Sequence, residues 1–438
     1  MRVGRDRECR SRSWSPHMSA PDGLINPRRR VIELLLARGA LSRTELARSM
    51  HLSKPTISAT VTELITEGVV QEVGVGPSAV GRKPILLRLG GMGRLVVGVE
   101  IDVGVCRLML VTLDGERLTS RELIADTGNV DVLLAALVDA VDALLLGRDR
   151  RALLGCGVAV PGVVNVAEET VDCMARLGWR DVPLQALLAG RLGVPVIVTD
   201  RGKAAGLGEL WYRGREKHDD LLYLYLGQGV AGAVVLGNAI HLGPTHTAGE
   251  FGHMVLDPAG PPCVCGRSGC LEAFIATGAM RARLRGALAD GRASTVTVED
   301  TERADGAMVT AIGAAADHGD ALACDLIAHA AYWLGIAVVN LVNVLNPSLV
   351  VLGGPLARWG RRLIAPIECA LDAHALPVTR RVVRVVASEA KETAPSLGAA
   401  ALMLQRAGEL LASTKVSPLV GVIPPADFSV PAGFVIVP

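Results

Sequence analysis

One short segment, residues 249–272, constrains the fold of this chain more than any other. It reads GEFGHMVLDPAGPPCVCGRSGCLE, with one histidine and three cysteines close together. An imidazole and three thiolates suit a four-coordinate structural zinc, because Zn²⁺ accepts both nitrogen and sulfur ligands. We therefore predict a metal-braced knuckle whose ligands are His253, Cys263, Cys265 and Cys270.

Two other interpretations of these cysteines fit the sequence less well. They could be unrelated buried thiols, but a Cys-x-Cys pair closely followed by a third cysteine is rare by chance. They could form disulfides, but the chain is long, its other cysteines are scattered, and it shows no secretion signal. The cysteine usage predicts a reducing cytoplasm. The knuckle would also bring two flanking carboxylates, Glu250 and Glu272, into one region.

The charge of the chain is unevenly distributed. At 438 residues it is long enough for two or three domains, and its net charge is only +1. Residues 1–90, however, carry a net charge of +7, and the remainder carries −6. A basic N-terminal segment followed by an acidic remainder indicates that the N-terminal segment binds a polyanion.

No segment reads as membrane-spanning. The most apolar helical stretch, Leu326 to Leu345, is interrupted by polar residues and predicts a core helix. Residues 1–25 carry charge without an apolar run, so we expect a disordered basic arm and no signal peptide. Met18 is an alternative start to Met1.

The pattern of residues 26–90 predicts a winged helix-turn-helix. Asn26 caps a first helix that Gly39 ends, and Ser42 with Glu45 forms a capping box for a second. Ser53 caps a third helix with one apolar face. A hairpin follows, with strands at 69–73 and 85–89.

In this reading the third helix enters the major groove of DNA, and the hairpin tip reaches the backbone or a minor groove. We expect outward-pointing contacts from Lys54, Thr56, Ser58 and Thr60. The alternative is a generic three-helix packing unit whose charges are only solvated. The helix order, the basic tip and the charge asymmetry favour DNA binding by Ser53, Lys54, Thr56, Ser58, Thr60, Arg82 and Lys83.

From Leu95 onward, short strands, glycines and amphipathic helices alternate, and the pattern starts again near Leu221. Two related α/β lobes around a cleft fit this alternation. We expect lobe 1 at 91–200, completed by a helix near 395–408, and lobe 2 at 201–394. Residues 409–438 form a tail without clear periodicity.

Several motifs, in order, resemble the family of repressors, open reading frames and kinases known as ROK. They are GVAVPGVVN, LGQGVAGAVVLGN, AGEFGHM, CVCGRSGCLE, NPSLVVLGG and LGAAAL, and the front segment resembles the regulator branch of that family. The resemblance covers roughly residues 26–408. It implies an actin-like two-lobe sugar-kinase fold, zinc at the knuckle, and a dimer or tetramer. It also places Glu250, His253 and Glu272 at a sugar.

Two departures from the family pattern concern phosphoryl transfer. Family kinases have an Asp-x-Gly-Gly-Thr loop for ATP phosphates, and the matching run here is Glu100 to Gly104, with Asp102 and Val103 at the glycine positions. Kinases also have an Asn-Asp pair whose Asp is the general base. The matching positions are Asp200 and Arg201, and a guanidinium cannot accept that proton.

A third departure is Arg176, which stands where the family commonly has an asparagine for a sugar hydroxyl. Arg176 and Arg201 would then both line the cleft and suit an anionic sugar derivative. The alternative is a dead pocket in which they pair with Asp200, Glu250 or Glu272.

These observations predict a non-enzymatic DNA-binding repressor that senses a sugar or anionic sugar derivative and reads a palindromic operator as a homodimer or homotetramer. The alternatives are an active sugar kinase with an added DNA-binding domain, and a ligand-independent DNA-binding protein.

Overall fold

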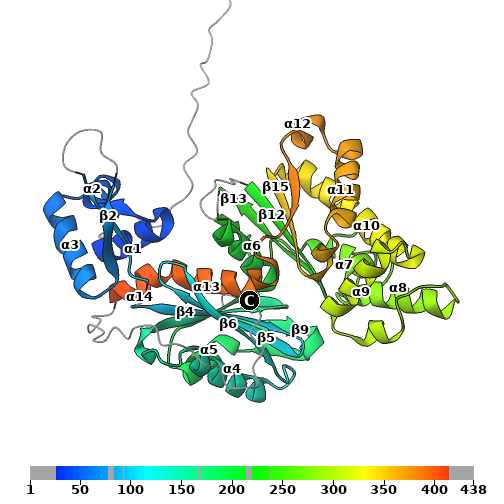
Figure 1. Cartoon of the computed structure of the whole chain (residues 1–438), viewed down its shortest axis with the longest axis horizontal. Helices are drawn as coiled ribbons and strands as arrows, with labels where there is room; N and C mark the ends of the chain where they lie inside the picture. The colour runs from blue at the N-terminus through cyan, green and yellow to red at the C-terminus, as the bar shows by residue number, and fades with distance from the viewer. Residues whose placement is uncertain are drawn as a thin grey trace, which may run out of the picture.

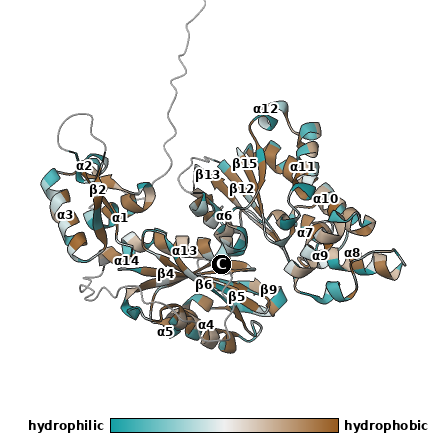
Figure 2. Cartoon of the chain, in the orientation of Figure 1, coloured by the Kyte–Doolittle hydropathy of each residue, from teal (hydrophilic) through white to brown (hydrophobic). Residues whose placement is uncertain are grey.

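The computed structural model describes residues 26–76, 83–91, 93–165, 169–213, 220–237 and 239–413. The predicted basic arm, the wing-tip residue Arg82, and the chain beyond residue 413 lie outside these ranges. Figure 1 shows a small N-terminal unit followed by two larger α/β lobes. In Figure 2, hydrophobic residues dominate the strands of both large sheets. The predicted fold class is confirmed.

The N-terminal unit is a winged helix. Its strand order is β1-β3-β2, and the predicted caps at Asn26 and Ser53 and the capping box of Ser42 with Glu45 are all present. Its elements are α1 (Pro27–Arg38), β1 (Leu41–Ser42), α2 (Arg43–Met50), α3 (Lys54–Thr66), β2 (Val70–Val75) and β3 (Ile85–Leu89).

Lobe 1 is built on a five-stranded sheet of order β11-β7-β4-β5-β6, in which β11, β7 and β4 are parallel. Its strands are β4 (Leu95–Asp102), β5 (Val105–Thr112), β6 (Arg117–Ile124), β7 (Leu153–Val160) and β11 (Val196–Asp200). A smaller sheet comprises β8 (Val163–Asn165), β9 (Thr170–Met174) and β10 (Trp179–Val182).

Helices cover both faces of the lobe 1 sheet (Figure 1). One face packs against α4 (Val130–Leu144) and α5 (Leu184–Leu192). The other packs against α13 (Ala394–Gln405), which continues into α14 (Ala407–Ser413). The sequence placed the start of the tail at residue 409, and this boundary falls inside α14. Short 3₁₀ turns are η1 (Arg150–Ala152) and η2 (Ala175–Leu177).

Lobe 2 is built on a second five-stranded sheet, of order β14-β13-β12-β15-β16. Its strands are β12 (Asp220–Leu226), β13 (Val230–Leu236), β14 (Ala239–His241), β15 (Leu349–Gly353) and β16 (Arg384–Ala387). Helix α6 (Arg201–Tyr212) lies between this sheet and α13, so it connects the two lobes.

The outer part of lobe 2 is helical. Its α-helices are α7 (Leu271–Ile275), α8 (Thr277–Ala289), α9 (Asp305–Asp317), α10 (Ala321–Leu345), α11 (Arg361–His374) and α12 (Pro377–Arg380). Its 3₁₀ turns are η3 (Phe251–His253), η4 (Glu299–Glu302), η5 (Pro355–Trp359) and η6 (Lys391–Thr393). Among the described residues α10 alone is long and apolar enough to cross a membrane, but most of it is buried in the core of lobe 2. The prediction of a core helix is therefore confirmed.

Candidate functional site

The four predicted metal ligands lie together. The ligand atoms of His253, Cys263, Cys265 and Cys270 are all within 4.8 Å of one another. The Cys263 Sγ is 3.7 Å from the His253 Nδ1, and the Cys265 Sγ is 3.8 Å from the Cys270 Sγ. Ligands bound to zinc in a tetrahedron lie roughly 3.6–3.8 Å apart. The donor set and its spacing therefore fit a metal ion.

The backbone of the knuckle explains this convergence. Gly269 has a φ of +72°, and a Cβ there would overlap the carbonyl oxygen of Asp257. Val255 and Cys270 form an antiparallel bridge, which brings the histidine-bearing turn η3 beside the cysteine loop. A backbone hydrogen bond from Arg267 lowers the pKa of the exposed Cys265 to about 7, which favours the thiolate that a metal binds.

Glu272 and Glu250 reach the same region from opposite ends of the knuckle. The Glu272 Oε2 accepts a hydrogen bond of 2.9 Å from the backbone N–H of Val230, so this carboxylate is fixed at the start of β13. Burial raises the pKa of Glu250, and nearby Asp200 and Glu272 raise it further, while Lys203 and His253 oppose them. These five side chains therefore form one electrostatic cluster, which we call the cleft cluster.

Asp200 and Lys203 are paired inside the cleft cluster. The Asp200 side chain caps α6 by accepting from the Lys203 N–H, and its second oxygen lies 2.5 Å from the Lys203 Nζ. The sequence indicates that Lys203 lies near the cleft but does not mark it as an effector ligand. Its position three residues after the N-cap Asp200 is the sequence signal that places it on the same helix turn.

Arg201 does not line the cleft, and this prediction is wrong. Its side chain is only 3% exposed, with Nη2 2.6 Å from Asp102 Oδ1 and Nε 3.3 Å from Glu100 Oε1. The guanidinium also lies 5.0 Å from the centre of the Tyr225 ring. Arg201 pairs with none of the carboxylates that the dead-pocket alternative named, because the β4 carboxylates are closer.

Arg176 is exposed and spans the two lobes. It belongs to η2 in lobe 1, and its Nη2 donates to the backbone carbonyl of Gln228, in the turn between β12 and β13 of lobe 2. The structure records no ion pair between Arg176 and the carboxylates of the cleft cluster. Arg176 therefore joins the two lobes through a neutral carbonyl.

In the loop that matches the phosphate-binding loop of kinases, backbone N–H groups are already hydrogen-bonded to side chains of this chain. The Val103 N–H donates to Asp102 Oδ1 at 2.8 Å, and the Gly104 N–H donates to Thr127 Oγ1 at 2.8 Å. A phosphate-binding loop needs such N–H groups free to point at the anion. Here side chains of the chain itself occupy them.

The recognition helix α3 presents part of the predicted DNA surface. Lys54 and Thr56 are exposed, Ser58 is half-buried, and Lys83 is exposed on the wing. The Ser53 hydroxyl accepts from the Thr56 N–H, so it also serves as the cap. Thr60 does not point outward as predicted. It is buried, and its hydroxyl donates to the Thr56 carbonyl, because its position lies on the side of α3 that faces the core.

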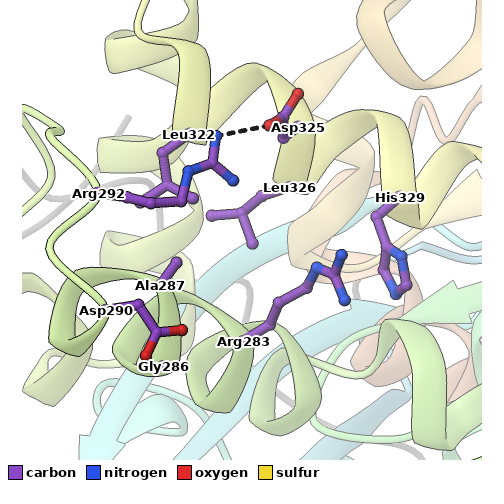
Figure 3. A pocket seen from close by; sticks show the side chains of 9 residues that line it. All are labelled: Arg283, Gly286, Ala287, Asp290, Arg292, Leu322, Asp325, Leu326 and His329. Atoms are coloured by element: carbon purple, nitrogen blue, oxygen red, sulfur yellow. Dashed lines mark hydrogen bonds and ion pairs between the residues drawn. The ribbon is translucent and has the colours of Figure 1, made fainter.

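A separate hollow of about 550 Å³ lies between α8 and α10, and no residue of the cleft cluster lines it. Figure 3 shows Arg283 pointing toward His329, and a dashed line joins Arg292 to Asp325, 2.7 Å apart. Burial, together with the charge of Arg283, lowers the pKa of His329. The hollow is thus lined by an ion pair and by two basic groups that repel each other.

Comparisons with known proteins identify the family of this chain. The ROK family profile matches residues 96–406, and a winged helix-turn-helix DNA-binding profile matches residues 27–71. A putative xylose repressor of Caldicellulosiruptor sp. (strain Rt8B.4) is 30% identical over 85% of this chain and 94% of its own length. A glucokinase of Halalkalibacterium halodurans is 34% identical over 65% of this chain and 87% of its own length.

Among solved structures, a ROK family transcriptional regulator, a homologue of the E. coli MLC protein, superimposes with a TM-score of 0.74. It is 25% identical, and the match covers 88% of this chain and 97% of that one. The family match, the winged helix and the two-lobe fold agree across nearly the whole length of these relatives. This chain is a member of the ROK family with an N-terminal winged helix-turn-helix.

Proposed function

We propose that this chain is a repressor that binds operator DNA through α3, senses a neutral sugar in its cleft, and does not phosphorylate that sugar. The observation that carries the proposal is the buried ion pair between Asp102 and Arg201. The two residues stand where ROK kinases have a phosphate-loop glycine and the general base. Each neutralises the other, so neither is available for phosphoryl transfer.

The charge of the cleft cluster supports a neutral sugar over an anionic one. Arg201 is withdrawn from the cleft, and Lys203 is already paired with Asp200. The cleft cluster then holds two further carboxylates, Glu250 and Glu272. Carboxylates accept hydrogen bonds from sugar hydroxyls but repel a phosphate or a sugar acid. Because relatives are named xylose repressor and glucokinase, D-xylose and D-glucose are the first ligands to test.

The metal centre has a structural role in this proposal. With Zn²⁺ bound, His253 and the three cysteines would complete a closed four-ligand site without an open position for substrate. The ion would hold the two segments that carry Glu250 and Glu272 at a fixed separation. The knuckle therefore contributes to sugar binding by positioning these carboxylates, and the metal itself does not touch the sugar.

For DNA binding we propose a homodimer or a homotetramer that reads a palindromic operator. Two copies of α3 would contact half-sites about one helical turn, or a multiple of it, apart. Lys54 and Lys83 supply positive charge at the N-terminus of α3 and on the wing.

Three measurements on the full-length protein test these proposals. DNA selected from a random library gives the operator, and its affinity is measured with and without sugar. Calorimetry with D-xylose and D-glucose, compared with their phosphates, gives the ligand class. A coupled ATP assay with the same sugars tests turnover, with an active ROK glucokinase as positive control.

The expected result is sugar-dependent operator binding, tighter binding of the neutral sugars, and no turnover. Robust ATP-dependent turnover would reject the non-enzymatic proposal and favour the kinase that the 34% identical glucokinase represents. Operator binding that no sugar alters would support a ligand-independent repressor. Tighter binding of the sugar phosphates than of the neutral sugars would support an anionic effector instead.

A further inference from the structure

The winged helix and lobe 1 share one hydrophobic core. A single cluster of buried side chains begins in α1, α2 and α3, continues through β4 and β5, and ends in α13 and α14. The members from α13 and α14 are Leu397, Ala400, Met403, Leu404, Ala407 and Leu411. Because packed interiors do not deform continuously, the winged helix cannot move independently of these two helices.

Helix α13 is fixed to lobe 1 by direct backbone contact. A Cβ at Gly98 of β4 would overlap the carbonyl oxygen of Ser396, and one at Gly157 of β7 would overlap that of Ala399. Such close approach is possible only for glycine. The helix therefore lies against two central strands with no side-chain layer between them.

The same kind of contact joins α13 to α6. A Cβ at Gly208 of α6 would overlap the carbonyl oxygen of Ala394, and one at Gly398 of α13 would overlap that of Ala204. The N-terminal end of α6 carries Asp200 as its cap, with Lys203 one turn in, so it forms one wall of the cleft cluster. A displacement of that wall must therefore move α13.

Helix α6 is also tied to lobe 2. The Glu209 carboxylate is fully buried and accepts a hydrogen bond of 2.6 Å from the Ser388 hydroxyl, just after β16. Glu209 also pairs with Arg213 at 2.7 Å. A change in the angle between the lobes therefore acts on the C-terminal end of α6.

At its far end, the α13–α14 pair reaches the DNA-binding unit. Gly408 of α14 faces α1 closely: a Cβ there would lie 3.0 Å from the Glu33 Cγ and 3.2 Å from the Arg29 carbonyl oxygen. Figure 1 shows α13 running from between the lobes to α14, which lies against α1. Helix α1 in turn packs on α3 in the shared core.

We infer that α6, α13 and α14 form a rigid mechanical connection that transmits the state of the sugar cleft to the recognition helix, with the α14–α1 contact at Gly408 as its final joint. This inference rests on the proposed sugar-sensing repressor. Sugar binding that changes the lobe angle shifts α6, and the glycine contacts pass this shift to α13. The shared core passes it to α1 and α3. By linkage, operator DNA bound at α3 must act back on the cleft to the same extent.

The test uses operator DNA as the probe and hydrogen exchange as the readout, on the full-length protein. Gly408→Val places a branched side chain at the joint and separates α14 from α1. Gly190→Val is the matched control, because Gly190 is also helical but, unlike the buried Gly408, is exposed and has nothing within 4 Å of its Cβ position. Gly408→Ala serves as a milder second variant should the valine impair folding.

In the wild type and in Gly190→Val, operator binding should slow hydrogen exchange several-fold in residues 198–205, far from the DNA. In Gly408→Val the DNA should still bind while this remote effect disappears. The ratio of operator affinities with and without the active sugar should fall from the usual range of about 5- to 150-fold to near one.

Two outcomes would overturn the inference. One is a wild type whose exchange at 198–205 is unchanged by DNA, and the other is a Gly408→Val protein that keeps the remote effect. Neither depends on finding the effector. Absence of a response to any sugar, with the DNA-induced exchange effect intact, would instead reject the sugar-sensing proposal and leave the connection in place.

Discussion

The Arg201 guanidinium lies 2.6 Å from the Asp102 carboxylate, although 98 residues separate them in the chain. Each residue alone is a departure from the kinase pattern of the family. Together they are complementary, because the charge that one brings into a buried place is neutralised by the other. The loss of phosphoryl transfer is therefore one linked change, in which a phosphate-loop position and a base position have become partners.

Removing one member of this pair should lower the free energy of unfolding much more than breaking an ion pair at the surface does. Arg201→Met would leave the buried Glu100 and the partly buried Asp102 without that cation, so we expect a loss of about 3–5 kcal/mol in the free energy of unfolding. Arg191→Met is the control, because its pair with Asp131 is exposed, and should cost at most about 1 kcal/mol. Urea unfolding measures both.

Adding Asp102→Asn to Arg201→Met should restore part of this stability, since it neutralises one uncompensated carboxylate. The same Asp102→Asn change in the wild type should destabilise. Additive effects in this double-mutant cycle would show that the two residues do not interact.

Loss of one metal ligand should reduce both metal content and stability. Cys265→Ser replaces a thiolate whose pKa is already lowered to about 7, so bound zinc should fall well below one ion per chain and the melting temperature should drop. Cys369→Ser, at an exposed cysteine outside the knuckle, should change neither. Elemental analysis and calorimetric melting give the two values, and a Cys265→Ser protein with full metal content would exclude this ligand set.

A positive charge at the start of α3 should contribute to DNA affinity independently of sequence. Lys54→Ala is expected to weaken operator and non-operator binding alike and to reduce the slope of log K against log salt by about 1. The exposed Arg361, on lobe 2, is the control and should leave the slope unchanged when replaced by alanine. Fluorescence anisotropy over a salt series measures the slope. A loss confined to the operator would mean that Lys54 contacts a base.

The pKa of Glu250 is raised, chiefly by burial, so its ionised form costs folding free energy. This cost is fully present above the raised folded pKa and vanishes below the unfolded value, near 4.3. Glu250→Gln should therefore stabilise the protein at pH 7–8, and the gain should shrink as the pH falls toward 4.5. Urea unfolding across this range measures the gain, with the exposed Glu302→Gln as control. The same variant should bind sugar more weakly, and a gain that grows on acidification would contradict the assignment.

Local features of the fold were predictable from sequence because their causes are local. The caps at Asn26, Ser42 and Ser53 follow from side chains that bond backbone N–H groups two or three residues away. The four metal ligands were found for the same reason, since all lie within one short segment. Thr60 was misplaced because it sits at the edge of the apolar face of α3, where periodicity alone does not fix the side that faces the core.

Features that depend on distant contacts were not predictable. Arg201 was assigned to the cleft because it matches the position of the general base in the family pattern. Its partners Glu100 and Asp102 come from a distant strand, β4. The packing of α14 on α1 joins the two ends of the described chain, and no local pattern near residue 409 indicated it. In both cases the fold brings together segments whose sequences give no indication that they will be in contact.

The shared core also sets an order of events during synthesis. The winged helix leaves the ribosome first, but Leu397 and Leu411, which complete its core, are made about 300 residues later. At roughly 5–20 residues per second, this delay lasts about 15–60 seconds. Throughout that interval the DNA-binding unit is unfinished. A nascent or truncated chain therefore lacks the surface against which α1 packs in the completed fold.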